Sequence, residues 1–252
     1  MKIARYGFRP SLPDHRNIPY QASQDGPLPE AIDLRVTGFF PEVWDQLAIG
    51  SCTSHGVLAA FEYEQRRQKL PPFNASRLAH YYMERTLEGS PLEDTGAEIR
   101  DGIKVVLADG VVDEKDWPYD IAKFAQRPPQ ELYHQALQHK AVEYQNIAVD
   151  GSSFHIRHAL SNNFPVIIGI AVYESFESDD VARTGVVPMP RRSESLIGGH
   201  CMLVVGYEGR NFIVRNSWGA DFGPDGGHPR IPFDYICDPN LGSDYWIIRS
   251  AS

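Results

Sequence analysis

Residues 45–55 read Asp-Gln-Leu-Ala-Ile-Gly-Ser-Cys-Thr-Ser-His, and the chain that follows has the pattern of a helix. Val57, Leu58 and Phe61 form an apolar stripe at helical spacing, basic residues gather near the far end, and two prolines then stop the pattern. These features predict a helix over Cys52–Leu70. They place the thiol of Cys52 in the first turn of that helix.

The position of Cys52 favours a reactive thiol. Free backbone N–H groups and the positive end of the helix dipole stabilise a thiolate at a helix start, which lowers the thiol pKa. Gly50 and Ser51 permit a close approach to that start. A small buried apolar residue is the ordinary explanation of a lone cysteine. Taken by itself, Cys52 leaves both interpretations open.

Four other residues are suited to work with this thiol. His200 follows two glycines and is suited to pair with Cys52 and then protonate a leaving amine. Asn216 is suited to orient the imidazole, and Trp218 to shield that hydrogen bond from water. Gln46 is suited to donate to an oxyanion beside the backbone N–H of Cys52. Each of these residues has an ordinary explanation when taken singly: a core histidine, a turn asparagine, a core tryptophan and a surface glutamine. Together with Cys52, the four residues suffice for nucleophilic acyl transfer.

Bulk composition narrows the class of protein. The 252 residues are 42% hydrophobic and 23% charged, which is typical of a globular protein with one domain or two packed lobes. The formal charge of −9 argues against a nucleic-acid partner. The nine histidines show no metal-ligand spacing, so we expect neither metal nor cofactor. We expect no membrane span. The start of the chain lacks a signal-peptide pattern, which predicts a cytoplasmic protein and leaves signal-independent export open.

Cysteine usage suits a reducing compartment. The chain has three cysteines, Cys52, Cys201 and Cys237. If Cys52 stays reduced, Cys201 and Cys237 are the sole candidates for a disulfide, and the odd count favours free thiols.

The pattern of elements changes near residue 140. Residues 1–30 are polar and proline-rich and read as an extended surface arm, which could lie along or near a cleft; residues 31–252 form the folded domain. Helices are predicted at Ser76–Glu88, Ile99–Ala108, Pro129–Gln138 and Ser153–Asn162, and strands at Val142–Val149, Val166–Val172, Met202–Tyr207, Phe212–Asn216 and Tyr245–Arg249. This pattern predicts an α+β protein, with a helical lobe at about 45–138 and a β-rich lobe at about 139–252.

The spacing of these residues resembles that of the papain family of cysteine peptidases. Gln46 precedes Cys52 by six residues, the tripeptide Asp33-Leu34-Arg35 starts thirteen residues before Gln46, and Asn216 follows His200 by sixteen. Asn-Ser-Trp-Gly at 216–219 is similar to a family motif, with Phe222 where the family has a second tryptophan. The resemblance covers roughly residues 28–250. Gly-Ser-Cys-Thr and the segment 6–16 are similar to bacterial members, in which that segment is a short leader.

The resemblance implies a papain-like two-lobe fold, with a helical N-terminal lobe, an antiparallel β-barrel-like C-terminal lobe and an active-site cleft between them. It implies an endopeptidase that forms a thioester acyl-enzyme. The catalytic residues implied are Cys52, His200, Asn216 and Gln46, and the substrate-binding residues are Gly96, Gly199 and Trp218. Leu47, Ile49 and Thr53 depart from the family pattern, which has glycine, cysteine and an aromatic residue at these positions.

Several alternatives remain at this stage. An acyl-enzyme on Cys52 could be resolved by an amine, which would make the protein a transpeptidase or ligase, or the target could be an isopeptide bond. A non-catalytic binding module with the same fold is a third reading. The segment Glu174–Leu196 just before His200 is either a gate on the cleft or a mobile solvated loop. The partners we expect are a protein or peptide substrate and a protein inhibitor of cysteine peptidases, and we expect a monomer.

Overall fold

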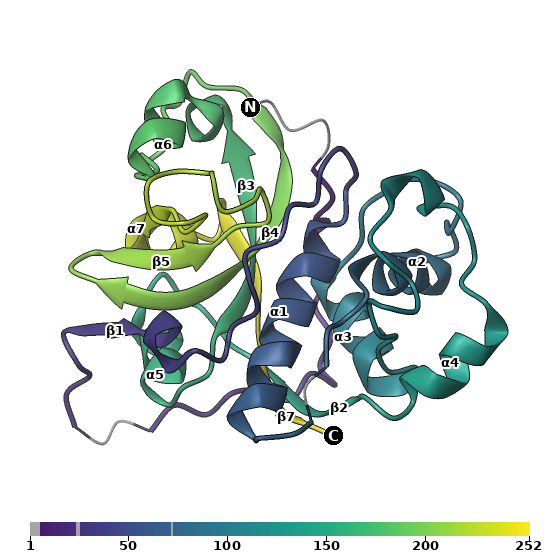
Figure 1. Cartoon of the computed structure of the whole chain (residues 1–252). Coiled ribbons are helices and arrows are strands. Elements are labelled where there is room, and N and C mark those ends of the chain that lie inside the picture. Colours follow the sequence, from purple (N-terminus) through teal and green to yellow (C-terminus); the bar gives the residue numbers. More distant parts are fainter. Residues whose placement is uncertain (1–5, 24–25, 72) are drawn as a thin grey trace.

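The central element of the molecule is the long helix α1 (Cys52–Arg67), which lies between a sheet and a group of helices (Figure 1). The computed structural model describes residues 6–23, 26–71 and 73–252; residues 1–5 and 24–25 of the predicted arm, and Pro72, lie outside the described residues. Every residue of α1 from Cys52 to Gln65 is buried. A helix buried on all sides must contact both halves of the protein, and its first residue therefore lies where they meet.

Helices make up one side of the molecule. They are α2 (Arg77–Leu87), α3 (Ile99–Ala108) and α4 (Gln130–Ala136), with the 3-10 turn η2 (Ile121–Lys123). Ser76 caps α2, because its hydroxyl accepts a hydrogen bond from the Ala79 N–H at 3.2 Å. The ends of these helices differ from the prediction by at most two residues.

An antiparallel sheet makes up the other side, with strand order β2-β7-β3-β4-β5-β6 and β1 paired to β4. Strands β2 and β6 end this order, so the sheet is open rather than a closed barrel. The strands are β1 (Ala31–Asp33), β2 (Ala141–Asn146), β3 (Val166–Tyr173), β4 (Leu196–Glu208), β5 (Asn211–Arg215), β6 (Arg230–Pro232) and β7 (Gly242–Ala251). The two-lobe α+β prediction is confirmed.

Alternation along β4 divides the core into two layers. Leu203 and Val205 pack with the apolar residues of α1 and α3, whereas Met202 and Val204 pack on the opposite face of the sheet. That second face is covered by α5 (Phe154–Ser161) and by the short helices α6 (Asp179–Thr184) and α7 (Phe233–Cys237). Strand β4 thus joins both layers and runs beside α1.

Some elements were not predicted. Strand β4 begins at Leu196 rather than Met202, and the short elements β1, β6, α6 and α7 were missed, as were the turns η1 (Leu34–Thr37) and η3 (Glu174–Glu177). The segment 174–196 is not simply a loop, since it contains η3 and α6. These pieces are too short to show periodicity, and they form because neighbouring strands and turns supply their hydrogen bonds. Among the described residues, no helix is both long and apolar enough to cross a bilayer.

Candidate active site

Cys52 is the first residue of α1 and is fully buried against strand β4. Its Sγ accepts a hydrogen bond from the backbone N–H of Cys201 at 3.4 Å. Burial raises the pKa of the Cys52 thiol to about 11, although the backbone N–H groups of Cys201 and Gly7 act in the opposite direction. In this arrangement the neutral thiol is therefore favoured.

His200 and Asn216 form a hydrogen-bonded pair beside the thiol. His200 Nε2 lies 2.8 Å from Asn216 Oδ1, which also accepts the Ser217 N–H at 2.8 Å. An amide oxygen only accepts, so Nε2 carries the hydrogen and Nδ1 presents a lone pair. Among the described residues, Nδ1 has no hydrogen-bond partner. Burial lowers the pKa of His200 to about 4 and the bond to Asn216 opposes this shift, so the imidazole is a neutral proton acceptor here.

Trp218 covers this pair. Its ring stacks on the His200 ring with centroids 5.0 Å apart and planes 30° apart. Phe176 and Phe222 meet the Trp218 ring edge-on at 5.6 and 4.9 Å. Phe222 therefore takes the place of the family's second tryptophan as an aromatic edge against Trp218. Aromatic walls exclude water and so strengthen the enclosed hydrogen bond.

Gln46 is fully buried and is held at both ends of its amide. Its Oε1 accepts from the Ser217 hydroxyl at 2.6 Å, and its Nε2 donates to the Ile49 carbonyl at 2.9 Å. One of the two Nε2 hydrogens is thereby used, and the second remains for another acceptor. Leu47 follows at φ 55°, a conformation that costs a residue with a Cβ roughly 1–2 kcal/mol. Leucine thus adopts the conformation that glycine would take freely.

The chain's own residues 6–9 occupy the space over Cys52. The Phe8 N–H donates to the Gly199 carbonyl at 3.0 Å, and the Ala97 N–H donates to the Gly7 carbonyl at 2.7 Å. The Arg9 N–H donates to the Ala97 carbonyl at 3.1 Å, so the segment and Ala97 run parallel. A Cβ on Gly96 would overlap the Gly7 carbonyl. The Gly96 region and the Gly199 carbonyl, predicted to hold a substrate backbone, thus hold this segment.

Two aromatic side chains fix the segment in place. The Phe8 ring is 5% exposed and lies where a Cβ on Gly169 would overlap it, beside a pocket of about 330 Å³ next to Gly198 and Gly199. The Tyr6 ring meets the His200 ring edge-on at 5.8 Å, and its hydroxyl bonds to Glu177 on η3. Residues 6–9 thus lie along the cleft, as the sequence analysis allowed, with Gly7 and Phe8 buried rather than on the surface. A polar, proline-rich composition did not show that two aromatic residues are anchors.

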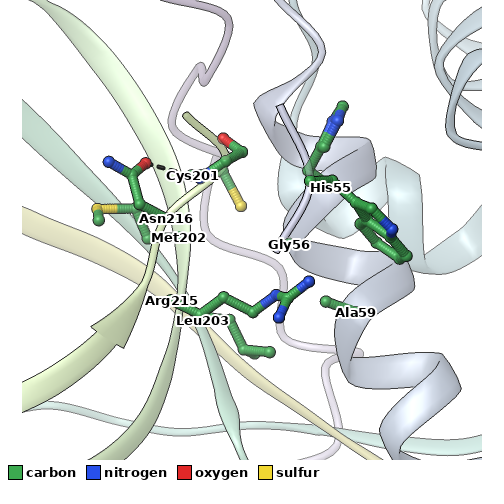
Figure 2. Close-up of a pocket in the computed structure, with 10 residues that line it drawn as sticks. His55, Gly56, Ala59, Cys201, Met202, Leu203, Arg215 and Asn216 are labelled. Atoms are coloured by element: carbon green, nitrogen blue, oxygen red, sulfur yellow. Dashed lines mark hydrogen bonds between the residues drawn. The ribbon is translucent and has the colours of Figure 1, made fainter. Parts of the chain in front are cut away.

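A second group of residues packs next to the His200–Asn216 pair, between β4 and α1 (Figure 2). The Cys201 side chain points toward Gly56 of the helix, where a Cβ would lie 2.8 Å from its Sγ. The closeness of strand and helix at this level brings the His200–Cys201 backbone to the sulfur of Cys52. Sequence analysis missed this role of Gly56 because the contact joins distant segments.

All three cysteines are buried and free, and Cys201 and Cys237 are unpaired. Among residues 6–23, 26–71 and 73–252, no group of three or more histidine, cysteine or acidic residues is arranged to hold a metal ion.

The structure thus has a buried thiol at a helix start, and the neighbouring strand β4 carries an imidazole hydrogen-bonded to an amide. This arrangement is typical of cysteine-dependent acyl-transfer enzymes. The model of the family described as "Papain family cysteine protease" matches residues 28–231. The chain belongs to the papain family of cysteine peptidases. The predictions of family, fold and peptidase activity are confirmed.

Three similar proteins place the chain within this family. It is 42% identical over 232 residues to an uncharacterised peptidase C1-like protein of Acanthamoeba polyphaga mimivirus, covering 87% of this chain and 74% of that one. It is 27% identical to cathepsin S of Bos taurus, covering 84% of this chain and 62% of that sequence, so it spans about three fifths of that relative. The crystal structure of xylellain, a cysteine protease from Xylella fastidiosa, superposes with a TM-score of 0.89 at 34% identity and covers 99% and 97% of the two chains. The likeness to xylellain agrees with the bacterial-type pattern.

Proposed function

We propose that this cysteine peptidase is an endopeptidase in which Cys52 is the nucleophile, His200 the acid and base, Asn216 the residue that orients His200, and Gln46 an oxyanion donor. The observation that carries the proposal is the 2.8 Å bond from His200 to Asn216 beside a sulfur at the start of α1. Order and spacing along the sequence support the same assignment.

The proposed reaction follows from the hydrogen positions. His200 Nδ1 takes the thiol proton, and Cys52 Sγ attacks the carbonyl carbon of the peptide bond. The oxyanion accepts hydrogen bonds from the Cys52 N–H and the second Nε2 hydrogen of Gln46. His200 then gives its proton to the leaving amine, and a thioester remains. Water attacks the thioester while His200 accepts a proton from the water. The C–S bond then breaks, His200 returns the proton to the sulfur, and the acid product and the free thiol are released.

We propose that residues 6–9 hold the site in a closed form that a substrate must displace. The segment uses the Gly199 carbonyl and the Gly96–Ala97 backbone, which are the groups expected to bind substrate. Residues 6–9 run parallel to Ala97. Their carbonyl groups therefore lie at other positions than those of a strand that ran antiparallel to Ala97.

We also propose that the pocket against Gly169, which the Phe8 ring fills in this structure, receives an aromatic or large apolar side chain of a protein substrate once residues 6–9 are displaced. A protein inhibitor of cysteine peptidases is a second proposed partner, and it would fill the same cleft as the substrate. The Gly169→Val substitution should lower kcat/KM for peptides with phenylalanine at this subsite more than for peptides with alanine. An equal loss for both peptides would argue against the pocket.

An activity-based probe tests the proposed nucleophile. A peptidyl epoxide should label the native protein and the Cys237→Ser control, and should not label Cys52→Ala. Product analysis of a cleaved peptide, with and without an added amine, should show hydrolysis as the main outcome. Failure of the native protein to label under reducing conditions would contradict the proposal, and exclusive aminolysis would favour the transferase alternative.

A further inference from the structure

A buried polar group lies behind the proposed nucleophile, on the side away from the cleft. Glu84 of α2 is 0% exposed, and its Oε2 accepts a hydrogen bond from the Thr53 hydroxyl at 2.9 Å. Thr53 is the residue after Cys52 in the first turn of α1. The position that carries an aromatic residue in the family thus carries a hydroxyl here, and that hydroxyl links the first turn to a buried acid.

The other oxygen of Glu84 faces a histidine. Glu84 Oε1 and His80 Nδ1 lie 3.5 Å apart, and both are buried without a hydrogen-bond partner. The second nitrogen of His80, Nε2, lies 3.0 Å from the Gly102 carbonyl. A carbonyl only accepts, so Nε2 carries a hydrogen. A carboxylate that faced the lone pair of a neutral Nδ1 would be repelled, and one proton between the two atoms removes this conflict.

The packing seals this pair. A Cβ on Gly102 of α3 would overlap Glu84 Oε1, so the helix backbone closes the space beside the carboxyl group. His80 is 1% exposed. A charge in this position would lose its hydration, which is costly without a paired counter-ion.

The charges around the pair do not neutralise Glu84. Burial is the main cause that raises the pKa of Glu84 to about 8; Asp101 of α3 adds to the shift, and Thr53 and Arg85 oppose it. Burial lowers the pKa of His80 to about 4. Arg85 gives its hydrogen bonds to backbone carbonyls, those of Tyr81, Pro91, Glu93 and Phe124. From α1, Thr53 contacts Glu84. A charge on Glu84 acts through space on two buried thiols, those of Cys52 and Cys201.

We propose that Glu84 and His80 share one proton, held on Glu84, and that this neutral pair, tied to the first turn of α1 by Thr53, keeps negative charge away from Cys52. The proposal rests on Cys52 as the nucleophile. When the proton leaves, the carboxylate behind the first turn of α1 opposes formation of the thiolate, since like charges repel; the same effect of Glu84 on Cys52 is among the causes that raise the thiol pKa. Loss of this proton therefore depresses reactivity at alkaline pH.

The first experiment looks for the proton. The infrared difference between the native full chain and Glu84→Gln near pH 6.5 should contain the carbonyl band of a protonated carboxyl group, and this band should fade as the pH rises through about 8. The difference removes the band of Glu62, whose pKa burial raises to about 7 and which both proteins contain. Absence of a Glu84-dependent band at pH 6.5 would overturn the proposal. This measurement does not depend on peptidase activity, so its failure is distinct from failure of the proposed function.

The second experiment measures the effect on Cys52. The rate of alkylation by iodoacetamide is followed from pH 6 to 10, and peptide mapping separates Cys52 from Cys201 and Cys237. In Glu84→Gln the amide accepts from Thr53 and donates to His80, so it imitates the protonated pair without a charge. We expect rates equal to the native protein below pH 7 and at least threefold higher above pH 8.5. Superimposable curves would overturn the coupling.

Thr53→Val is the second variant and serves if Glu84→Gln does not fold. Removal of the hydroxyl takes away a hydrogen bond that favours the ionised carboxyl group, so the infrared band should persist to higher pH than in the native protein. An unchanged midpoint would contradict the link through Thr53.

Discussion

The two walls of the cleft hold their reactive groups by different means. On the sheet side, His200 lies in the long strand β4, and its ring is fixed by Asn216 and covered by Trp218. On the helix side, Cys52 begins α1, and the first turn rests on Glu84 through Thr53. On the sheet wall, backbone pairing of β4 and the neutral hydrogen bond to Asn216 hold His200 in place. The helix wall depends on a buried group whose proton can leave, so pH should affect the two sides differently.

The largest expected effect comes from removal of either reactive group. Cys52→Ala and His200→Ala should each lower kcat/KM by about 10³-fold or more, because residues that act as one unit each carry nearly the whole effect. Steady-state cleavage of a peptide substrate measures it, with Cys237→Ser as a matched control. If either variant kept a tenth of the native activity, the assignment of that wall would be wrong.

Loss of the orienting amide should have a smaller effect. Asn216→Ala removes the acceptor of the His200 Nε2 hydrogen, which frees the ring and its tautomer, and should lower kcat by about 10²-fold. Asn216→Asp keeps an acceptor and is the control for packing. A fall in kcat with little change in KM would sharpen the view that the sheet wall orients the base. A change in KM alone would point to substrate binding instead.

Opening of the cleft should change the pH dependence of the thiol. Burial raises the pKa of Cys52 to about 11, so at pH 7 little thiolate is present in the closed form. Phe8→Ala weakens the anchor of residues 6–9, exposes the sulfur to water and lowers its pKa. Each unit of that decrease raises the thiolate fraction about tenfold. Alkylation of Cys52 at pH 7 should therefore become about tenfold faster, and its pH profile should move to lower pH.

The control for this prediction is a change just beyond residues 6–9, at an exposed side chain. Leu12→Ala alters a residue that is 78% exposed and should leave the alkylation rate as it was. Equal rates for Phe8→Ala and the native protein would mean that residues 6–9 do not limit access.

The smallest effect should come from the hydroxyl that holds Gln46. Ser217→Ala removes the 2.6 Å bond to Gln46 Oε1, and one neutral hydrogen bond contributes about 1 kcal/mol. We expect kcat to fall about fivefold, with Gln46→Ala as the more severe reference. If Ser217→Ala were as damaging as Gln46→Ala, Ser217 would have a role of its own.

Much of this molecule was readable from the chain. The features that could be read are Cys52 at a helix start, the interval from His200 to Asn216, and the helix predicted over Cys52–Leu70, although α1 ends at Arg67. They depend on local periodicity and spacing. Such features survive in sequence because a helix buries residues three and four apart and a strand alternates its faces. The fold class was predicted from these patterns, and the family and the site residues from their resemblance to the papain family.

Tertiary structure decided what lies around these residues. The anchoring of Tyr6 over His200, the contact of Gly56 with Cys201, and the bond from Thr53 to Glu84 each join segments far apart in the sequence. Burial raises the pKa of Cys52 and of Glu84 and lowers that of His200, so that all three groups are neutral. This burial exists only once the lobes pack together. The sequence alone determined which groups can react; the packed fold decided their protonation states, because removal of water from a charged group depends on its three-dimensional surroundings.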